Sequence, residues 1–299
     1  MTFENFSPSD PDLTILPPVA GSAAVAPARS DGQVEIGYRL RDMVSQLTHL
    51  YQRGCGRARF PSVERADFPE AVLINTAGGL TGGDRLSFNV KLEAGARLTV
   101  SGQAAEKIYR SVGTMATIDT ALEVKEGASL EWLPQETILF EKSRLKRMNT
   151  VHLETGSRLI AVEATVFGRA AHGETLHAAT IQDGWKIWRQ GVLIWYDKFV
   201  LDGDLDVMTA RPALLAGAGA MATVLIADDA ASDYLEFARS VAADVDARAA
   251  VTCRDGLLIM RVLGQDGYIL RKALARILTD MRSRLAGHPV PLPKVWENH

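Results

Sequence analysis

The sequence has 299 residues, of which 47% are apolar and 23% are charged, an ordinary composition for a globular protein. Its net charge of −3 offers no excess of basic side chains to displace counterions, so we expect no nucleic-acid binding. Cys55 and Cys253 are isolated, which fits a reducing compartment better than a disulfide framework. Acidic residues precede the first basic residue, Arg29, unlike a secretory signal, and no apolar run approaches the about 20 residues that cross a bilayer. We therefore expect a cytoplasmic protein outside the membrane.

The first part of the chain changes character near residue 34. Residues 1–33 hold five prolines among Ser, Ala and Gly, which predicts a disordered or loosely docked leader. From residue 34 to residue 41, apolar and polar side chains alternate with a period of two, the pattern of a half-buried strand. A short apolar run at 72–74 is the next candidate strand. We expect one β-rich domain over residues 34–286.

A repeated pattern occupies the middle of the chain. Each unit is an alternating strand, a glycine followed by a small residue, and a second alternating strand; the units are residues 90–100, 122–132 and 151–161. The central glycines, Gly95, Gly127 and Gly156, lie 32 and 29 residues apart, since 127 − 95 = 32 and 156 − 127 = 29. A nearly constant period of this length indicates stacked β units. The pattern predicts a mainly β fold, either a β-solenoid-like or a layered two-sheet body. Three unrelated hairpins in a sandwich would alternate similarly, and this alternative stays open.

The pattern changes again from about residue 228. Acidic residues open an amphipathic helix that reaches Val241, and two short strands follow at 248–253 and 256–263. Apolar residues at three- and four-residue steps predict a second helix over 268–285. The proline-rich tail, 287–299, cannot continue that helix and is expected to be extended. The C-terminal quarter is therefore expected to hold about two helices.

A glycine-rich segment at residues 75–85 is the densest local motif. Gly78 and Gly83 have the spacing of a phosphate-binding P-loop, but Asp84 stands where such a loop needs lysine. The residues that follow alternate like a strand, so no helix N-terminus is available for an anion. These features argue against nucleotide binding. They favour a tight turn in which Asp84 accepts hydrogen bonds from backbone N–H groups.

This segment also carries a family resemblance. Residues 73–86 resemble the signature of the urease accessory protein UreD family, also called UreH. Three further segments resemble motifs of that family in the same order: residues 101–111, 132–140 and 167–174. The resemblance covers roughly residues 34 to 280. Four motifs in register are far more specific than any one of them alone.

The resemblance implies an accessory protein without catalytic residues. Members of the family bind apo-urease, recruit the nickel-carrying GTPase UreG through UreF, and support assembly of the urease metallocentre; a homodimer can form within the accessory complex. Nickel transfer requires weak, exchangeable ligands, so we expect no tightly bound cofactor and no stable metal site. The expected transient nickel path comprises Asp84, Glu136, Glu163 and Glu174. The expected motif and partner-contact residues are Gly78, Gly79, Gly82, Gly83, Asp84, Gln103, Lys107, Tyr109, Arg110, Ser111, Trp132, Pro134, Gly168 and Arg169.

The acidic residues permit two interpretations. A buried carboxylate is unfavourable unless it is paired, so each acid could form an ion pair with Lys107, Arg85 or Arg169. Together they could instead line a polar passage. Two other functions compete with the family's role. One is a β-solenoid enzyme that uses paired carboxylates, and the other is an interaction scaffold without any role in metal delivery.

Overall fold

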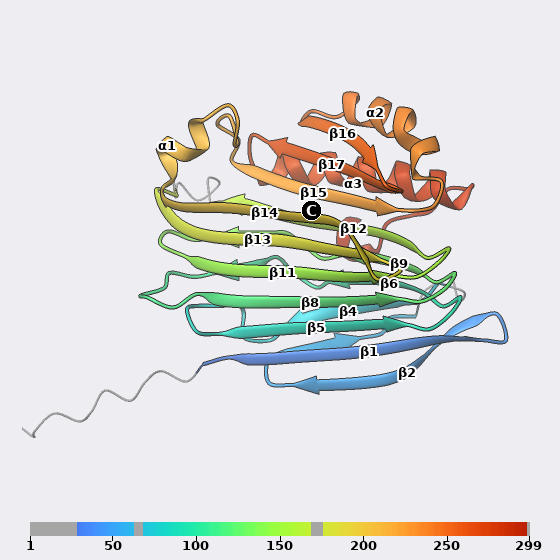
Figure 1. Cartoon of the computed structure of the whole chain (residues 1–299). Helices are drawn as coiled ribbons and strands as arrows, with labels where there is room; N and C mark the ends of the chain where they lie inside the picture. The colour runs from blue at the N-terminus through green and yellow to red at the C-terminus, as the bar shows by residue number, and fades with distance from the viewer. Residues whose placement is uncertain (1–28, 63–67, 169–175, 298–299) are drawn as a thin grey trace, which may run out of the picture.

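The computed structural model describes residues 29–62, 68–168 and 176–297 (Figure 1). The described residues form two sheets that face each other. The seven-stranded sheet consists, in spatial order, of β14 (Val192–Asp204), β13 (Ala178–Arg189), β11 (Arg144–Leu153), β8 (Ala116–Val124), β5 (Arg85–Leu92), β1 (Asp31–Arg41) and β2 (Val44–Arg53). Its five inner strands are parallel, and the two edge strands pair antiparallel with them.

The ten-stranded sheet forms the second layer. Its main path is β16 (Arg248–Arg254), β17 (Leu257–Gly264), β15 (Ala220–Ala227), β12 (Arg158–Phe167), β9 (Ser129–Leu133), β6 (Arg97–Gly102), β4 (Glu70–Asn75) and β3 (Gly56–Arg59). Two short strands, β7 (Glu106–Ile108) and β10 (Thr137–Leu139), extend it beside β12. The strands β4, β6, β9 and β12 are parallel, as expected for successive coils of a solenoid.

The three glycine turns join the two sheets. Each turn leads from a strand of the seven-stranded sheet to one of the ten-stranded sheet: β5 to β6, β8 to β9 and β11 to β12. Gly95, Gly127 and Gly156 have φ angles of 69°, 64° and 64°, which favour glycine because it lacks a Cβ. The turns also stack, because the Gly95 N–H donates to the Glu126 carbonyl. The predicted stacking of β units is confirmed, and the sandwich alternative is wrong because the strands flanking each glycine lie in different sheets.

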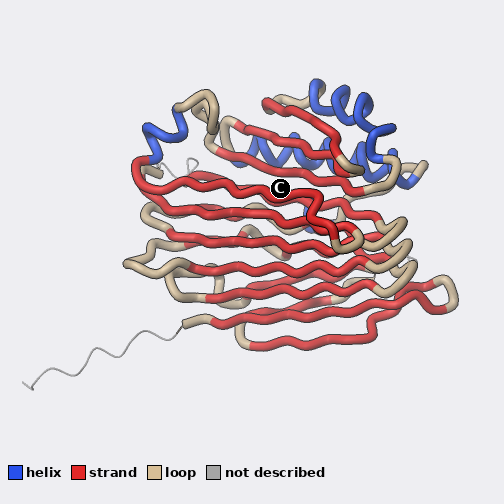
Figure 2. The backbone as a smooth tube through the Cα atoms, in the orientation of Figure 1, coloured by secondary structure: helices blue, strands red, loops and turns tan. Residues whose placement is uncertain are grey.

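Helices cover the outer face of the ten-stranded sheet over β12, β15, β17 and β16 (Figure 2). The two main ones are α2 (Leu235–Ala243) and α3 (Gly267–Ala286), close to the two predicted helices. The Asp266 side chain caps α3 by accepting from the Ile269 N–H, and Gly287 ends the helix with a φ of 75°. The described residues also contain η2 (Ala231–Tyr234) before α2 and the short α1 (Leu205–Ala210), which the sequence pattern does not predict.

The C-terminal tail departs from the prediction. Residues 288–293 lack helix or strand, but the tail then forms the short helix α4 (Lys294–Glu297). The Trp296 side chain is 4% exposed and packs with the core between helices and sheet. Its indole Nε1–H donates to the Leu133 carbonyl at 3.0 Å. The expectation of a wholly extended tail was wrong, because burial of Trp296 stabilises a helical turn. Residues 1–28 of the predicted leader lie outside the described residues, and β1 begins at Asp31.

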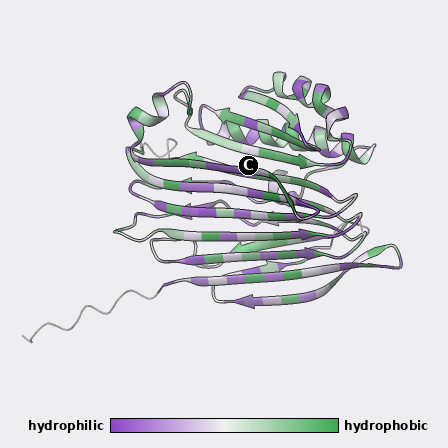
Figure 3. Cartoon of the chain, viewed as in Figure 1, coloured by the Kyte–Doolittle hydropathy of each residue, from purple (hydrophilic) through white to green (hydrophobic). Residues whose placement is uncertain are grey.

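A polar layer divides the space between the two sheets. Along β11, the inward-facing residues change from Leu145 to Arg147 and Asn149 and then to Val151. Thr120 interrupts β8 in the same way, and Glu163 with Thr165 interrupts β12. Two apolar clusters therefore lie on either side of buried polar groups. Figure 3 shows the alternation of hydrophilic and hydrophobic residues along the strands. Among the described residues, no helix is long and apolar enough to cross a membrane.

Candidate functional site

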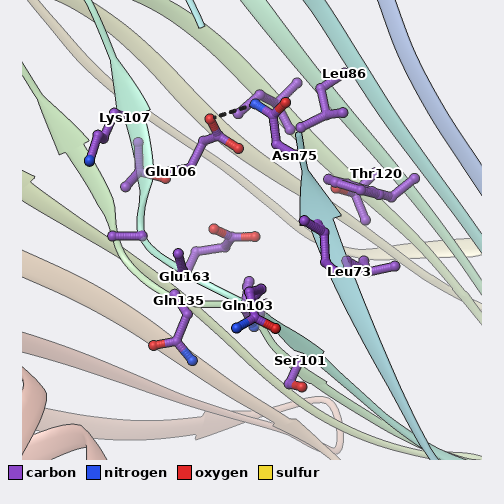
Figure 4. A pocket seen from close by; sticks show the side chains of 18 of the residues that line it. Leu73, Asn75, Leu86, Ser101, Gln103, Glu106, Lys107, Thr120, Gln135 and Glu163 are labelled. Atoms are coloured by element: carbon purple, nitrogen blue, oxygen red, sulfur yellow. Dashed lines mark hydrogen bonds between the residues drawn. The ribbon is translucent and has the colours of Figure 1, made fainter. Parts of the chain in front are cut away.

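A cavity of about 480 Å³ lies between the sheets at this polar layer (Figure 4). Strands of both sheets line it, because Phe88 comes from β5 and Val100 from β6. Three of the four segments that resemble family motifs contribute to its walls; their lining residues include Leu73, Asn75, Gly78, Gly79, Ser101, Gln103, Lys107, Trp132, Pro134 and Gln135. Segments separated by about 30 residues in the sequence meet here because each lies on a successive coil.

The glycine-rich segment links β4 to β5 and lies against β7. The Leu80 N–H donates to the Lys107 carbonyl at 2.7 Å, and the Tyr109 N–H donates to the Leu80 carbonyl at 2.7 Å. Gly79 has a φ of 145°, and a Cβ there would lie 2.4 Å from a ring carbon of Tyr109. A Cβ on Gly82 would overlap the Ser111 hydroxyl. The glycines therefore permit close packing of two chain segments, as the prediction of a tight turn required.

Asp84 braces this turn. One carboxylate oxygen accepts from the Ser30 N–H at 2.8 Å, and the other accepts from the Thr81 N–H at 2.7 Å. The side chain is buried, and it does not belong to the residues that line the cavity. Nearby Gly83 has a φ of 90°. The predicted hydrogen bonds from backbone N–H groups to Asp84 are confirmed.

Arg147 is the central cation of the polar layer. Its Nη1 lies 2.6 Å from Glu163 Oε2, and its Nη2 lies 2.6 Å from Asp183 Oδ2. Glu163 also accepts from the Trp132 indole at 3.1 Å. Burial raises the pKa of Glu163, and Arg147 opposes that effect. Burial also disfavours the charged form of Arg147, but the carboxylates of Asp183 and Glu163 more than offset it and raise the pKa of Arg147. The group therefore holds a buried, charged guanidinium.

Glu106 is a carboxylate of the cavity that the sequence analysis did not single out. The Asn75 amide Nδ2 donates to Glu106 Oε1 at 2.9 Å (Figure 4). Burial raises the pKa of Glu106 to about 7, and the hydrogen bond from Asn75 opposes that rise. Within the described part of the chain, no cationic side chain forms an ion pair with Glu106. Sequence alone could not find it, because its burial depends on the stacking of coils.

Glu136 faces the helical side of the structure. Its Oε2 lies 3.0 Å from Arg271 Nη1 of α3, and the Arg271 guanidinium lies 4.4 Å from the Trp296 ring centre. Ion pairing is thus found for Glu136 and Glu163, but the predicted partners Lys107 and Arg85 were wrong for both. Those two side chains are exposed, whereas Arg147 and Arg271 are directed into the fold.

The remaining predicted residues lie around the loops beside the cavity. The Tyr109 hydroxyl donates to the Gly78 carbonyl at 3.1 Å, and the Tyr109 and Phe140 rings meet edge to face at 4.9 Å. Arg110 and Ser111 belong to the same loop, and the Ser111 hydroxyl donates to the Thr114 carbonyl at 2.5 Å. Gly168 ends β12 with a φ of 83°. Arg169 and Glu174 lie outside the described residues.

The site offers few metal ligands in one place. Within residues 29–62, 68–168 and 176–297, no group of three or more His, Cys, Asp or Glu side chains could hold a metal ion. His177 contacts Asp206 at 2.7 Å on the exposed surface, away from the cavity lining. The cavity instead presents individual carboxylates, amides and hydroxyls. Such oxygen donors bind a divalent ion weakly and exchange it readily.

Comparisons with known proteins agree with the resemblance. The family model described as UreD urease accessory protein matches residues 30–297, so the match also includes the tail. The urease accessory protein UreD of Magnetococcus marinus is 38% identical over 287 residues, covering 92% of this chain and 99% of the relative. UreD of Rhizobium leguminosarum bv. trifolii is 39% identical over 275 residues, covering 92% and 98% of the two chains. UreD 1 of Brucella abortus biovar 1 is 41% identical over 269 residues, covering 90% and 94%. The chain belongs to the UreD family of urease accessory proteins, which assist urease and are not themselves the enzyme.

Proposed function

We propose that this chain binds apo-urease and, together with UreF and UreG, supports nickel delivery during assembly of the urease metallocentre. Membership of the UreD family supports a role in urease maturation. The more specific proposal, binding of apo-urease and nickel delivery, is supported by one observation: three of the motif segments line the same cavity between the sheets. We further propose that the protein acts in the cytoplasm, where Cys55 and Cys253 would remain the free thiols that they are here.

The loop that follows β7 is the proposed contact for a protein partner. Val112 is 92% exposed and Tyr109 is 38% exposed, and Arg110 beside them is exposed as well. A bridge between Arg110 and Ser143 and the hydrogen bond from Ser111 to Thr114 hold the loop in place. Tyr and Arg on an ordered surface are the side chains that contribute most at protein interfaces. UreF or apo-urease would bind to this loop. We also propose, separately, that the chain forms a homodimer within the accessory complex.

Nickel would be cargo rather than a resident cofactor. Of the proposed path residues, Glu163 lies in the cavity, whereas Asp84 braces a turn and Glu136 faces α3. A passage through the polar layer would therefore run past Glu163 rather than along the other two. Weak oxygen ligands support passage, because a tight cage would retain the ion.

Reconstitution of a urease gene cluster in a host without urease would test this function. The cluster is expressed with and without this chain, and nickel per urease active site is measured together with ammonia release. Loss of both, while urease subunits still accumulate, is the expected result. Equal nickel loading without this chain would overturn the proposal and favour an interaction scaffold without a metal role. Val112→Asp should weaken partner binding, whereas Tyr196→Asp on exposed β14 serves as the matched control.

A further inference from the structure

The hairpin of β1 and β2 forms one border of the seven-stranded sheet. Within the described part of the chain, β2 pairs with β1 on one side and with no strand on the other (Figure 1). The outer N–H and C=O groups of β2 are therefore available to another strand. Six large apolar side chains of the hairpin are exposed: Leu40, Met43, Val44, Leu47, Leu50 and Tyr51. Apolar side chains gathered in this way mark a surface that binds another molecule.

Local contacts hold the hairpin in one conformation. Asp42 and Met43 form its turn with φ angles of 50° and 62°, the backbone geometry that matches the twist of two antiparallel strands. The Thr48 hydroxyl donates to the Gly37 carbonyl at 3.1 Å. The Ser45 hydroxyl accepts from the Arg97 N–H at 2.8 Å and so ties β2 to the ten-stranded sheet. An ordered surface binds a partner with little loss of conformational entropy.

The surroundings of β2 are basic, although the whole chain has a net charge of −3. Residues 39–60 contain five arginines and one aspartate and no lysine or glutamate, which gives a net charge of 5 − 1 = +4. Ion pairs with Asp42 and Asp31 neutralise Arg41 and Arg53. The other three arginines, which are Arg39 at the end of β1 and Arg57 and Arg59 in β3, form no ion pair with a described residue.

We propose that β2 binds an extended, acidic segment of a partner protein, which adds to the seven-stranded sheet as a further strand. The exposed backbone edge supplies hydrogen bonds, and the apolar side chains of the hairpin supply contacts with alternate residues of the segment. Carboxylates on the partner would lie near the arginines of β1 and β3.

The charge of this surface distinguishes an acidic partner from a second copy of the chain. Two copies joined through β2 would bring the same arginine-rich surroundings together, which opposes a stable pair. When no acidic partner is present, the apolar side chains stay open to association of another kind. The surface is separate from the loop that follows β7, and its assignment does not depend on the proposed role in nickel delivery.

Peptide binding to the full-length chain tests the proposal. The chain is immobilised at low density, so that copies cannot associate, and binding is followed by surface plasmon resonance. The probe is a peptide of alternating valine and glutamate with the ten-residue length of β2. We expect saturable binding that weakens as added salt screens the charges. A peptide with lysine in place of glutamate, and one with two adjacent central prolines, should bind far more weakly, because the first lacks the charge and the second cannot form a regular strand.

A charge reversal locates the contact on the chain. Arg39→Glu should weaken binding of the valine–glutamate peptide by about fivefold or more, as expected for loss of an exposed charge pair. Arg211→Glu reverses an exposed arginine at the end of α1, away from the hairpin, and should bind like the unmodified chain. Circular dichroism of both variants shows that they are folded.

Four results would overturn the proposal. They are equal binding of the lysine peptide, equal binding of the proline peptide, unchanged binding by Arg39→Glu, and no binding by the unmodified chain at millimolar peptide. A discrete dimer in analytical ultracentrifugation that Leu50→Lys converts to monomer would assign β2 to a second copy instead. None of these results bears on the reconstitution experiment, so the proposed function and this surface stand or fall separately.

Discussion

The Arg147 guanidinium lies 2.6 Å from the Glu163 carboxylate, and this contact joins the two sheets through the polar layer. Arg147 belongs to β11 of the seven-stranded sheet, and Glu163 belongs to β12 of the ten-stranded sheet. Both side chains are almost completely buried. Removal of either partner leaves the other charge in a medium that cannot solvate it. The pair therefore links the two sheets, and both residues line the cavity.

Replacement of Arg147 should be strongly destabilising. Arg147→Ala leaves the carboxylates of Glu163 and Asp183 buried without their cation, and we expect a loss of about 3–5 kcal/mol in the free energy of unfolding. Urea denaturation would measure the change. Lys146→Ala alters the neighbouring, exposed residue of β11 and should change stability by less than about 0.5 kcal/mol. Similar losses for the two variants would show that the buried pair does not hold the sheets together.

Stability should depend on pH through Glu106. Its pKa is about 7 in the folded chain and 4.5 in the reference state, so the folded chain retains this proton more strongly. The stability that Glu106 contributes is thus fully present below pH 4.5, the pKa of the reference state. It is lost as the pH rises through about 7, the pKa in the folded chain. The full loss is at most about 3 kcal/mol. Glu106→Gln should lack this decline when urea denaturation is compared at about pH 5 and about pH 8.

The matched control for the pH profile is Glu123→Gln, which removes an exposed carboxylate of β8. This variant should retain the decline in unfolding free energy as the pH rises from about 5 to about 8. If Glu106→Gln and Glu123→Gln follow the same profile as the unmodified chain, the pKa of Glu106 is not the cause of that decline.

Gly79 should tolerate substitution less well than Gly127. Both have positive φ, at 145° and 64°, but only Gly79 is in close contact with neighbouring atoms. An alanine Cβ at Gly79 would lie 2.7 Å from the Lys107 carbonyl oxygen, whereas at Gly127 it would meet nothing within 4 Å. We expect Gly79→Ala to cost about 3 kcal/mol or more and Gly127→Ala about 1 kcal/mol. Thermal or urea unfolding checks the order, and equal costs would show that the loop can move away from β7.

The sequence predicted the parts of the fold that depend on local pattern. Gly95, Gly127 and Gly156 mark turns because a repeated backbone conformation requires the same residue each time. The apolar spacing predicted α3 closely, since one face of that helix packs on the sheet. The ion pairs could not be predicted. Glu163 meets Arg147 only because the register of two sheets brings them together, and no spacing along the chain encodes that register.

The candidate site, too, could be predicted from the sequence only in part. The motif segments identified the glycine-rich turn and several cavity-lining residues, but they did not separate Asp84, which braces a turn, from Glu163, which lies in the cavity. Glu106 lies inside one of those segments, but the sequence does not distinguish it, because its carboxylate becomes buried only when the coils stack. The prolines of the tail predict an extended chain, whereas the buried Trp296 side chain packs the tail against the core between helices and sheet.

The edge strand β2 should make the isolated chain prone to self-association. It presents unpaired backbone groups at the border of the seven-stranded sheet, and Leu47 and Leu50 are 39% and 42% exposed. Its sole Lys, Arg, Asp or Glu residue is Arg53 at its end, so the strand lacks the charges that normally prevent edge-to-edge pairing. Leu50→Lys should reduce light scattering and sedimentation of large species while changing stability by less than about 0.5 kcal/mol. Val207→Lys adds the same charge to the exposed short helix α1, outside any edge strand, and should leave self-association unchanged. If both variants reduce association equally, net charge is responsible rather than the edge of β2.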